Sequence, residues 1–331
     1  MRLERYFKTE LISVYMMRNK MEIKSIINNE RMFTIKWRLT EWCNYRCSYC
    51  LRKFKGQDTK LNELNILKIA PQVNRLIEEA GKDVKLNLIG GEITYLNLIK
   101  IISLLKSSNL KKIHITTNFS NNLLYYVDLA NYLLSRNIML SMNISYHNEY
   151  VGLDEFIKKA VAFRTIALNL YSFKLEFVVA PENEKMLQEV KEKCKENNLD
   201  YLIELDKSQT KEYFETLNIQ SSVQKPKWVI NYIDGTSDKN ITRSQLINQF
   251  EDKLFPTKDY YCTSGMTYIY IRENKVAKNS TCIHGEQYVP IEQYHINKEI
   301  CKCDNPTGKC NLCGDFSISL DKEELNDLFK K

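Results

Sequence analysis

The sequence lacks both a membrane anchor and a secretion signal. No apolar run among its 331 residues approaches the ~20 residues that a membrane-spanning helix needs. Residues 1–8 include an early glutamate, and no small-residue cleavage site follows an apolar core. We therefore expect a cytoplasmic protein with no membrane partner.

A block of consecutive basic residues is also absent, although 48 Lys and Arg against 41 Asp and Glu give a net charge of +7. A solvated lysine surface accounts for this excess, and attraction of an anionic partner such as tRNA is the alternative. We expect nucleic acid not to be a partner. Hydrophobic content of 44% and charged content of 27% are ordinary for a globular protein. The length suits one large domain plus a smaller one.

The ten cysteines are not arranged as in a disulfide-rich secreted scaffold. Nine of them fall in two groups, within residues 43–50 and 262–313, and Cys194 stands alone in a segment rich in Lys and Glu. Clustered cysteines in an intracellular chain indicate metal or cluster ligands. We interpret both groups in this way and Cys194 as a structural residue.

The first group, Cys43, Cys47 and Cys50, has the spacing C-x3-C-x2-C. Four thiolates close the coordination of a 4Fe–4S cluster, so three in one loop hold three irons and leave the fourth open to another ligand. An open metal position is what a site needs if it is to act on a bound molecule. A zinc knuckle with a distant fourth ligand is the structural alternative.

At these residues the sequence resembles the radical S-adenosylmethionine (SAM) superfamily, whose signature is this spacing with an aromatic residue before the third cysteine, here Tyr49. The resemblance implies that the three cysteines bind a 4Fe–4S cluster and that the Tyr49 backbone contacts adenine. It implies that SAM chelates the open iron and is cleaved reductively to a 5′-deoxyadenosyl radical. It also implies an electron donor such as flavodoxin or ferredoxin. The motif indicates this class of enzyme without identifying the substrate.

Strand and helix patterns alternate along the first two thirds of the chain. Strands are expected at residues 34–40, 84–89, 112–116, 138–145, 173–179 and 201–205, and helices at 61–80, 96–105, 122–135, 154–168 and 182–196. This alternation predicts an α/β fold with right-handed crossovers and a parallel sheet. Six units are too few for a closed eight-stranded barrel. The resemblance implies a partial (β/α)6 TIM-like barrel with a small C-terminal cysteine-rich module that contains a β-hairpin.

Several of these strands carry polar residues on one face. In residues 138–147 the set from Ile138 to Tyr146 is apolar, whereas Ser141, Asn143 and Ser145 alternate with it. Parallel strands covered by helices should be apolar on both faces. Polar faces on five strands therefore predict a sheet that curls around a wet, ligand-filled lumen.

Gly90, Gly91 and Glu92 follow the second predicted strand, at the end of the barrel where ligands bind. Two glycines let the backbone approach a ligand without a Cβ atom. The segment resembles the GGEP motif of the superfamily, whose backbone and glutamate meet the SAM amino group. Here Ile93 replaces the proline.

Later strand ends supply the other SAM contacts that the resemblance implies. These contacts are at Thr117, Asn118, Asn143 and Ser145. Thr117 and Asn118 stand where many members carry Thr-Asn-Gly, with Phe119 in place of the glycine. Asn143 and Ser145 match positions that bind the ribose and carboxylate of SAM. The nearby His147 is either a proton carrier on the substrate side or an ordinary loop residue.

The second cysteine group surrounds a hairpin pattern at residues 266–276 and ends in C-x2-C. It resembles the twitch and SPASM modules, which hold auxiliary 4Fe–4S clusters, although full SPASM modules have seven cysteines. We expect one auxiliary 4Fe–4S cluster on Cys262, Cys282, Cys310 and Cys313, with Cys301 and Cys303 as spares. The alternative is a zinc site on Cys301, Cys303, Cys310 and Cys313.

The expected domain organisation follows from these segments. We predict an N-terminal extension at 1–33, the barrel core at 34–206, a linker and barrel-closing segment at 207–258, the auxiliary-cluster module at 259–316 and a C-terminal helix at 317–331.

The substrate is predicted only as a class. Members with such C-terminal modules most often modify peptides or protein side chains, so a peptide substrate comes first. No separate peptide-binding leader domain is visible at the N-terminus, which counts against a peptide. A small-molecule dehydrogenase or epimerase acting on a sugar or aminocyclitol is the second possibility. A zinc- or cluster-bearing RNA-binding protein is the alternative from another class.

Overall fold

The computed structural model describes residues 22–29, 31–50, 59–205, 221–222, 228–241, 246, 255–278, 288–303, 309–310 and 316–328. Among the helices of these ranges, none is long and apolar enough to cross a membrane.

The larger of the two main sheets contains the six strands that the sequence predicts. They are β2 (Phe33–Thr40), β3 (Val84–Gly90), β4 (Leu110–Thr117), β5 (Met139–Tyr146), β6 (Leu170–Val179) and β7 (Asp200–Leu205). Each is parallel to the next, in chain order. The sheet is open, because β7 forms one edge and a strand from the C-terminal third forms the other. The partial barrel is therefore confirmed.

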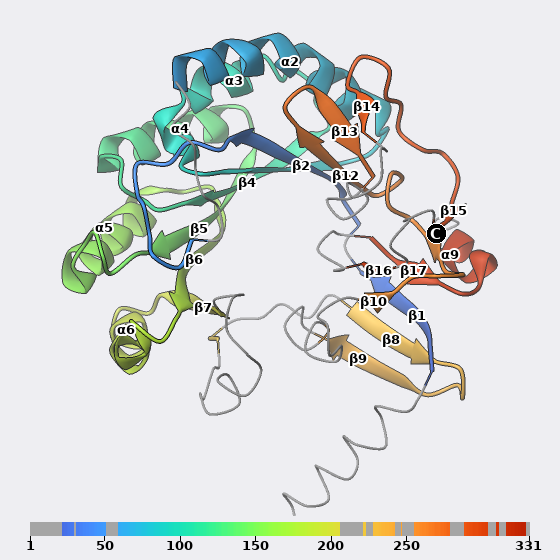
Figure 1. The fold of residues 1–331 in the computed structure, drawn as a ribbon. Helices are drawn as coiled ribbons and strands as arrows, with labels where there is room; N and C mark the ends of the chain where they lie inside the picture. Colours follow the sequence, from blue (N-terminus) through green and yellow to red (C-terminus); the bar gives the residue numbers. More distant parts are fainter. Residues whose placement is uncertain are drawn as a thin grey trace, which may run out of the picture.

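Helices cover the outer face of this curved sheet (Figure 1). They are α2 (Thr59–Glu79), α3 (Leu98–Ser103), α4 (Leu123–Ser135), α5 (Leu153–Ile166) and α6 (Leu187–Glu196). Gly81 follows α2 with φ +62, the left-handed conformation expected of a helix-ending glycine. Two predicted helices are shorter than expected. α3 covers only Leu98–Ser103 of the predicted 96–105, after a 3-10 turn η1 (Ile93–Tyr95), and the 3-10 turn η2 (Glu184–Met186) takes the start of the helix predicted at 182–196.

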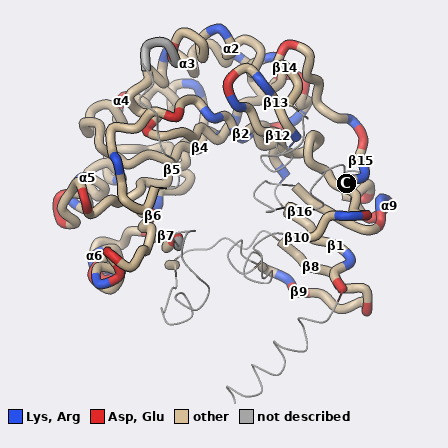
Figure 2. Tube along the Cα trace, viewed as in Figure 1, with Lys and Arg blue, Asp and Glu red and all other residues tan. Residues whose placement is uncertain are grey.

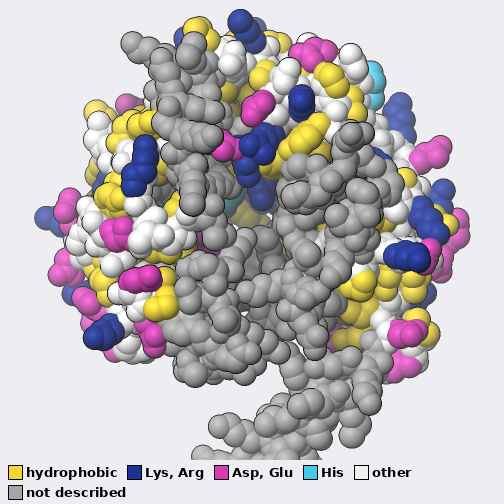
Figure 3. All heavy atoms as spheres, in the orientation of Figure 1, with side chains coloured by type: hydrophobic (Ala, Val, Ile, Leu, Met, Phe, Trp, Pro, Cys, Tyr) yellow, Lys and Arg dark blue, Asp and Glu magenta, His cyan; other side chains and the backbone are white. Residues whose placement is uncertain are grey.

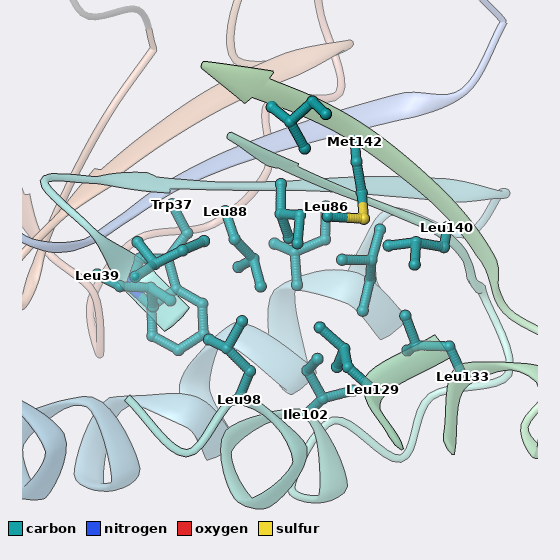
Figure 4. Packing of buried hydrophobic residues seen from close by; sticks show 14 of the residues in the cluster. Trp37, Leu39, Leu86, Leu88, Leu98, Ile102, Leu129, Leu133, Leu140 and Met142 are labelled. Atoms are coloured by element: carbon teal, nitrogen blue, oxygen red, sulfur yellow. The ribbon is translucent and has the colours of Figure 1, made fainter. Parts of the chain in front are cut away.

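The main core lies between the sheet and these helices. Figure 4 shows Leu86 and Leu88 of β3 near Leu98 and Ile102 of α3. All four side chains are fully buried. Burying such a side chain contributes about 1.5–3 kcal/mol, so this layer is what holds the strands in one curved surface.

The opposite face of the strands carries polar residues predicted on β2, β4, β5 and β6, and Asn87 of β3, which was not predicted, joins them. Polar side chains at every second position are partly accessible, whereas their neighbours are buried: Lys36, Arg38, Asn87, His114, Thr116, Asn143, Ser145, Lys174 and Glu176. The apolar alternates of the same strands belong to the core under the helices. The alternation of polar and apolar residues along these strands therefore predicted their inward face correctly.

The C-terminal hairpin does not stand apart from the barrel. Its strands β12 (Tyr268–Arg272) and β13 (Lys275–Ala277), followed by β14 (Val289–Pro290), extend the same sheet to nine strands. β12 runs parallel to β2. The reason lies in its two faces, because Ile269 and Ile271 join the main core whereas Tyr268 and Tyr270 pack in a second core.

That second core belongs to a sheet assembled from distant segments. Its strands, in spatial order, are β15 (Cys301–Lys302), β11 (Tyr261–Cys262), β17 (Ile318–Ser319), β1 (Ile23–Asn28), β8 (Trp228–Tyr232) and β9 (Ser237–Ile241). The short pair β10 (Phe255–Pro256) and β16 (Lys309–Cys310) and helix α9 (Lys322–Asp327) complete the described elements. The sheet draws strands from four of the five predicted segments, and the domain boundaries stay predictions.

Candidate functional site

The three cysteines of the first group lie in the loop directly after β2, at the C-terminal edge of the barrel strands. The amide of Cys50 donates a hydrogen bond to the Cys47 carbonyl over 3.1 Å, so the loop turns back on itself. Burial raises the pKa of the Cys43 thiol, and it raises that of Cys47 to about 12, with neighbouring thiolates adding to both effects. Crowded thiols of this kind become thiolates when a bound metal supplies positive charge.

The described residues do not form a mononuclear metal site. Within these ranges, no three His, Cys, Asp or Glu side chains converge as the ligands of one ion would. A zinc ion needs about four ligands within ~2.3 Å, whereas each thiolate of an iron–sulfur cluster binds its own iron. The cluster and the zinc knuckle both stay predictions for this loop.

Residues after β5 hold the middle of the cysteine loop. The Nδ1 atom of His147 lies 3.2 Å from Cys47 Sγ and 2.8 Å from the Tyr49 hydroxyl. Burial lowers the pKa of His147 to about 4, so its imidazole is neutral at pH 7. The carboxylate of Glu149 accepts hydrogen bonds from the Ser48 amide and hydroxyl. The sequence marked His147 only as a proton carrier or loop residue and gave no signal for these contacts.

Two aromatic rings add to the contact between the cysteine loop and the segment after β5. The rings of Tyr45 and Tyr150 stack with centroids 4.0 Å apart and planes 7° from parallel. The Arg46 amide donates to the Tyr150 hydroxyl over 2.6 Å. Every residue of the loop from Tyr45 to Tyr49 thus contacts the segment after β5.

The glycines at the end of β3 serve a backbone contact that the sequence did not reveal. A Cβ atom at Gly90 would lie 2.5 Å from the Thr40 carbonyl oxygen, and one at Gly91 would lie 2.0 Å from the Trp42 carbonyl oxygen. The Gly91 amide donates to the Thr40 carbonyl over 3.0 Å. The close approach that requires glycine is therefore to the start of the cysteine loop. Their contact with SAM stays a prediction.

The Glu92 side chain is fully buried and takes four hydrogen bonds. Its carboxylate accepts from the amide and hydroxyl of Thr94, from the Thr117 hydroxyl and from the Asn118 amide, over 2.6–3.0 Å. Burial raises the pKa of this carboxyl group, and the four donors oppose that rise. The side chain ties the end of β3 to the end of β4, and its predicted contact with the SAM amino group stays untested.

Asn118 carries this connection to the first cysteine. Its side-chain amide donates to Asn44 Oδ1 over 2.8 Å and lies 3.8 Å from Cys43 Sγ. The next residue, Phe119, has φ 57, the left-handed conformation that favours the glycine found there in the superfamily motif. Lys159 of α5 donates to the Phe119 carbonyl over 2.6 Å, which holds the phenylalanine in this conformation.

The remaining predicted SAM contacts lie on the inward face of β5. The Asn143 amide donates to Glu176 of β6 over 3.1 Å. Ser145 is partly accessible and precedes His147 on the same strand end. The structure thus brings Glu92, Thr117 and Asn118 together beside Cys43, and it places Asn143 and Ser145 on the strand that leads to Cys47.

The C-terminal cysteines are described only in part, because Cys282 and Cys313 lie outside the described residues. Cys262 of β11 stands directly opposite Cys301 of β15 in an antiparallel pair. Cys310 is buried opposite Phe255 in the second core. Cys301, which the sequence left as a spare, is therefore the described cysteine in register with Cys262.

Comparison with known proteins decides the family of the barrel. The model of the Radical SAM superfamily matches residues 37–170, which span β2 to the start of β6. The chain contains a radical SAM domain. The matched residues include all three cysteines of the first loop and the hydrogen-bonded residues Glu92, Thr94, Thr117 and Asn118. The family implies a 4Fe–4S cluster and SAM.

One curated relative also matches. An S-adenosylmethionine-dependent nucleotide dehydratase of Psychrobacter lutiphocae is 35% identical over 92 residues, which cover 25% of this chain and 30% of that protein. The match therefore spans less than a third of that relative's length.

Solved structures of Streptococcus suis SuiB are similar at lower identity. SuiB itself matches with a TM-score of 0.49 and 13% identity, over 79% of this chain and 64% of that chain. SuiB bound to SAM matches with a TM-score of 0.48 and 15% identity, over 80% and 62%. SuiB bound to its precursor peptide SuiA matches with a TM-score of 0.48 and 14% identity, over 80% and 63%.

Proposed function

We propose that this chain is a radical SAM enzyme that binds a 4Fe–4S cluster on Cys43, Cys47 and Cys50 and cleaves SAM reductively. The observation that carries the proposal is the position of three free cysteines, in one C-x3-C-x2-C loop, at the C-terminal edge of a partial barrel. Ligands of barrel enzymes bind at that edge.

The bound cluster and SAM supply the chemistry: one electron splits SAM into methionine and a 5′-deoxyadenosyl radical, which removes a hydrogen atom from the substrate. The protein holds the reacting groups in place. Glu92 positions Asn118, and Asn118 contacts Asn44 beside Cys43. His147 and Tyr150 position the other end of the loop.

The contacts with SAM are proposed from the resemblance. They are at Tyr49, Gly90, Gly91, Glu92, Thr117, Asn118, Asn143 and Ser145. The Glu92 and Thr117 side chains are hydrogen-bonded to each other. We therefore propose that these two residues contact SAM through their backbone groups. An electron donor such as flavodoxin or ferredoxin would reduce the cluster.

We propose one auxiliary 4Fe–4S cluster in the C-terminal third, on Cys262, Cys282, Cys310 and Cys313. The register of Cys262 with Cys301 supports Cys301 as the spare that would replace a member of this set. Such a cluster would bind the substrate or accept the second electron of an oxidation.

The substrate that we propose first is a peptide or protein side chain, because the C-terminal cysteines resemble the modules of enzymes that modify peptides. A small molecule is the second candidate. The observation in its favour is the relative, similar over 92 residues, that is named a nucleotide dehydratase. The two candidates differ in size and charge, so a binding experiment separates them.

Cleavage of SAM tests the proposed activity. Anaerobically reconstituted protein, reduced with dithionite and given SAM, is expected to form 5′-deoxyadenosine, measured by liquid chromatography. Cys47→Ala is expected to abolish the product, whereas Cys194→Ala, which changes a cysteine far from the loop in sequence, keeps it. Product from Cys47→Ala at the wild-type rate would contradict the ligand assignment.

A further inference from the structure

Two arginines stand side by side on the inward face of the barrel, just before the cysteine loop. Arg38 of β2 and Arg272 of β12 are partners in the parallel register of these strands. Both arginines lie on the inward face of the sheet, because their chain neighbours Trp37 and Ile271 point to the core under the helices. Like charges on adjacent strands destabilise a sheet. This pair is therefore a feature that folding alone does not favour.

One carboxylate lies between the two guanidinium groups. Glu41 Oε1 is 3.0 Å from Arg38 Nη1 and 2.9 Å from Arg272 Nη2. Glu273 Oε1 also lies 3.9 Å from Arg272 Nε, so the formal charges of the two arginines and the two glutamates cancel. The Glu41 oxygen uses only one of the five N–H groups that each guanidinium carries, which leaves further donors on both arginines.

One of those unused groups is buried. In the part of the chain that the structure describes, Arg38 Nε has no solvent exposure and no hydrogen-bond partner. The Tyr270 ring lies 5.6 Å from the same guanidinium and holds it in place. A buried donor without a partner costs about 1–3 kcal/mol, so this arginine is held in place at a cost to stability.

The arginines open onto a cavity of about 710 Å³, which Glu41 and residues of α2 also line. The other charged residues of its lining are Lys68, Glu273 and Glu292, which are solvent-exposed side chains on its rim. Water screens such rim charges more than the half-buried arginine pair. Figure 3 shows Lys and Arg side chains gathered near the middle of one face, where the surface is hollowed.

We propose that Arg38 and Arg272 bind an oxyanion of the substrate, a carboxylate or a phosphate, and that Glu41 occupies the anion position until the substrate displaces it. The planar fork of each guanidinium suits two parallel hydrogen bonds to such a group. Glu41 directly precedes Trp42 and Cys43 in the chain, so the anion position is next to the start of the cluster loop. This assignment rests on the proposed function and adds a chemical feature of its substrate.

Calorimetric titration of the reconstituted full-length protein tests the assignment. The probes are inorganic pyrophosphate, an equimolar mixture of the four ribonucleoside triphosphates and an acidic peptide with free carboxylates. One class is expected to bind, and Arg272→Gln and Arg38→Gln are expected to weaken it about tenfold or more, as loss of a charge-assisted bond predicts. Arg272→Lys, which keeps the charge and loses the fork, is expected to bind with intermediate affinity.

Two further variants distinguish an anion-binding site from an ion pair that only stabilises the fold. Glu41→Gln removes the competing carboxylate and is expected to tighten anion binding. Arg31→Gln, an exposed arginine beside α9, removes the same charge elsewhere and is expected to change the affinity less than about twofold.

Three results would overturn the proposal. They are that no probe binds, that Arg272→Gln binds the probe as tightly as Arg31→Gln does, or that Glu41→Gln weakens binding. Preference for the triphosphates would indicate a nucleotide, and preference for the peptide would indicate a peptide. SAM cleavage without substrate, measured on the same samples, reports separately on the proposed activity.

Discussion

A Cβ atom at Gly91 would lie 2.0 Å from the carbonyl oxygen of Trp42, so the glycine and the residue before Cys43 are in backbone contact. Gly91→Ala must push the start of the cysteine loop away from β3. We expect this variant to lose most of its iron after reconstitution, measured as iron per chain and by visible absorption. Gly152→Ala is the matched control, since its Cβ would meet nothing within 4 Å, and it should keep its iron. Equal iron in both variants would contradict this role.

The carboxylate of Glu92 satisfies four buried donors. Glu92→Ala leaves them without an acceptor, at about 1–3 kcal/mol for each group that stays dry. We expect its free energy of unfolding, measured in urea, to fall by at least about 3 kcal/mol. The exposed Glu182→Ala should change it by less than about 0.5 kcal/mol. A Glu92 variant as stable as this control would show that the network contributes little.

The His147 contact with Cys47 predicts an effect on the reduction potential. A neutral imidazole that donates to a cluster thiolate stabilises the more negative, reduced cluster. His147→Phe is therefore expected to lower the midpoint potential, followed by electron paramagnetic resonance during a redox titration. His295→Gln, at an exposed site, should leave the potential unchanged. An unaltered potential in His147→Phe would mean that the imidazole does not donate to this sulfur.

Cys194 is fully buried, and burial raises its pKa to about 12. Only the thiolate reacts with alkylating reagents, so we expect Cys194 of metal-free folded protein to stay unlabelled by iodoacetamide at pH 8. The partly exposed Cys303 should be labelled under the same conditions. Mass spectrometry of the digested protein measures both sites. Labelling of Cys194 as fast as Cys303 would contradict its structural role.

Metal content tests the auxiliary centre. Two 4Fe–4S clusters require about eight irons per chain, whereas one cluster with a zinc site gives about four irons and one zinc. We expect about eight from elemental analysis of reconstituted protein. The second pattern would favour the zinc site on Cys301, Cys303, Cys310 and Cys313.

Much of the barrel could be predicted because its signals are local. The inward set around Asn143 and the buried set around Leu140 alternate within one strand, and glycine at 81 marks a helix end in its own turn. The intermixed charges of the outer helices, visible in Figure 2, likewise follow from the sequence. Local patterns therefore placed the cysteine loop at the correct edge of the sheet.

The remaining features depend on contacts between distant residues. Ser25 pairs with Ser319, and Arg38 pairs with Arg272, across separations that leave no pattern in either segment. The reason for Gly91 lies in the Trp42 backbone, and His147 meets Cys47 only because β5 ends beside the loop. These relationships appear only once the sheet is assembled.

In the proposed active site, three thiols leave one iron of a cluster open and SAM occupies it. The most direct measurement is the low-temperature electron paramagnetic resonance spectrum of dithionite-reduced, reconstituted protein, recorded with and without SAM. We predict the signal of a reduced 4Fe–4S cluster whose g values shift when SAM is added. A spectrum with no such signal, or one that SAM leaves unchanged, would contradict the account.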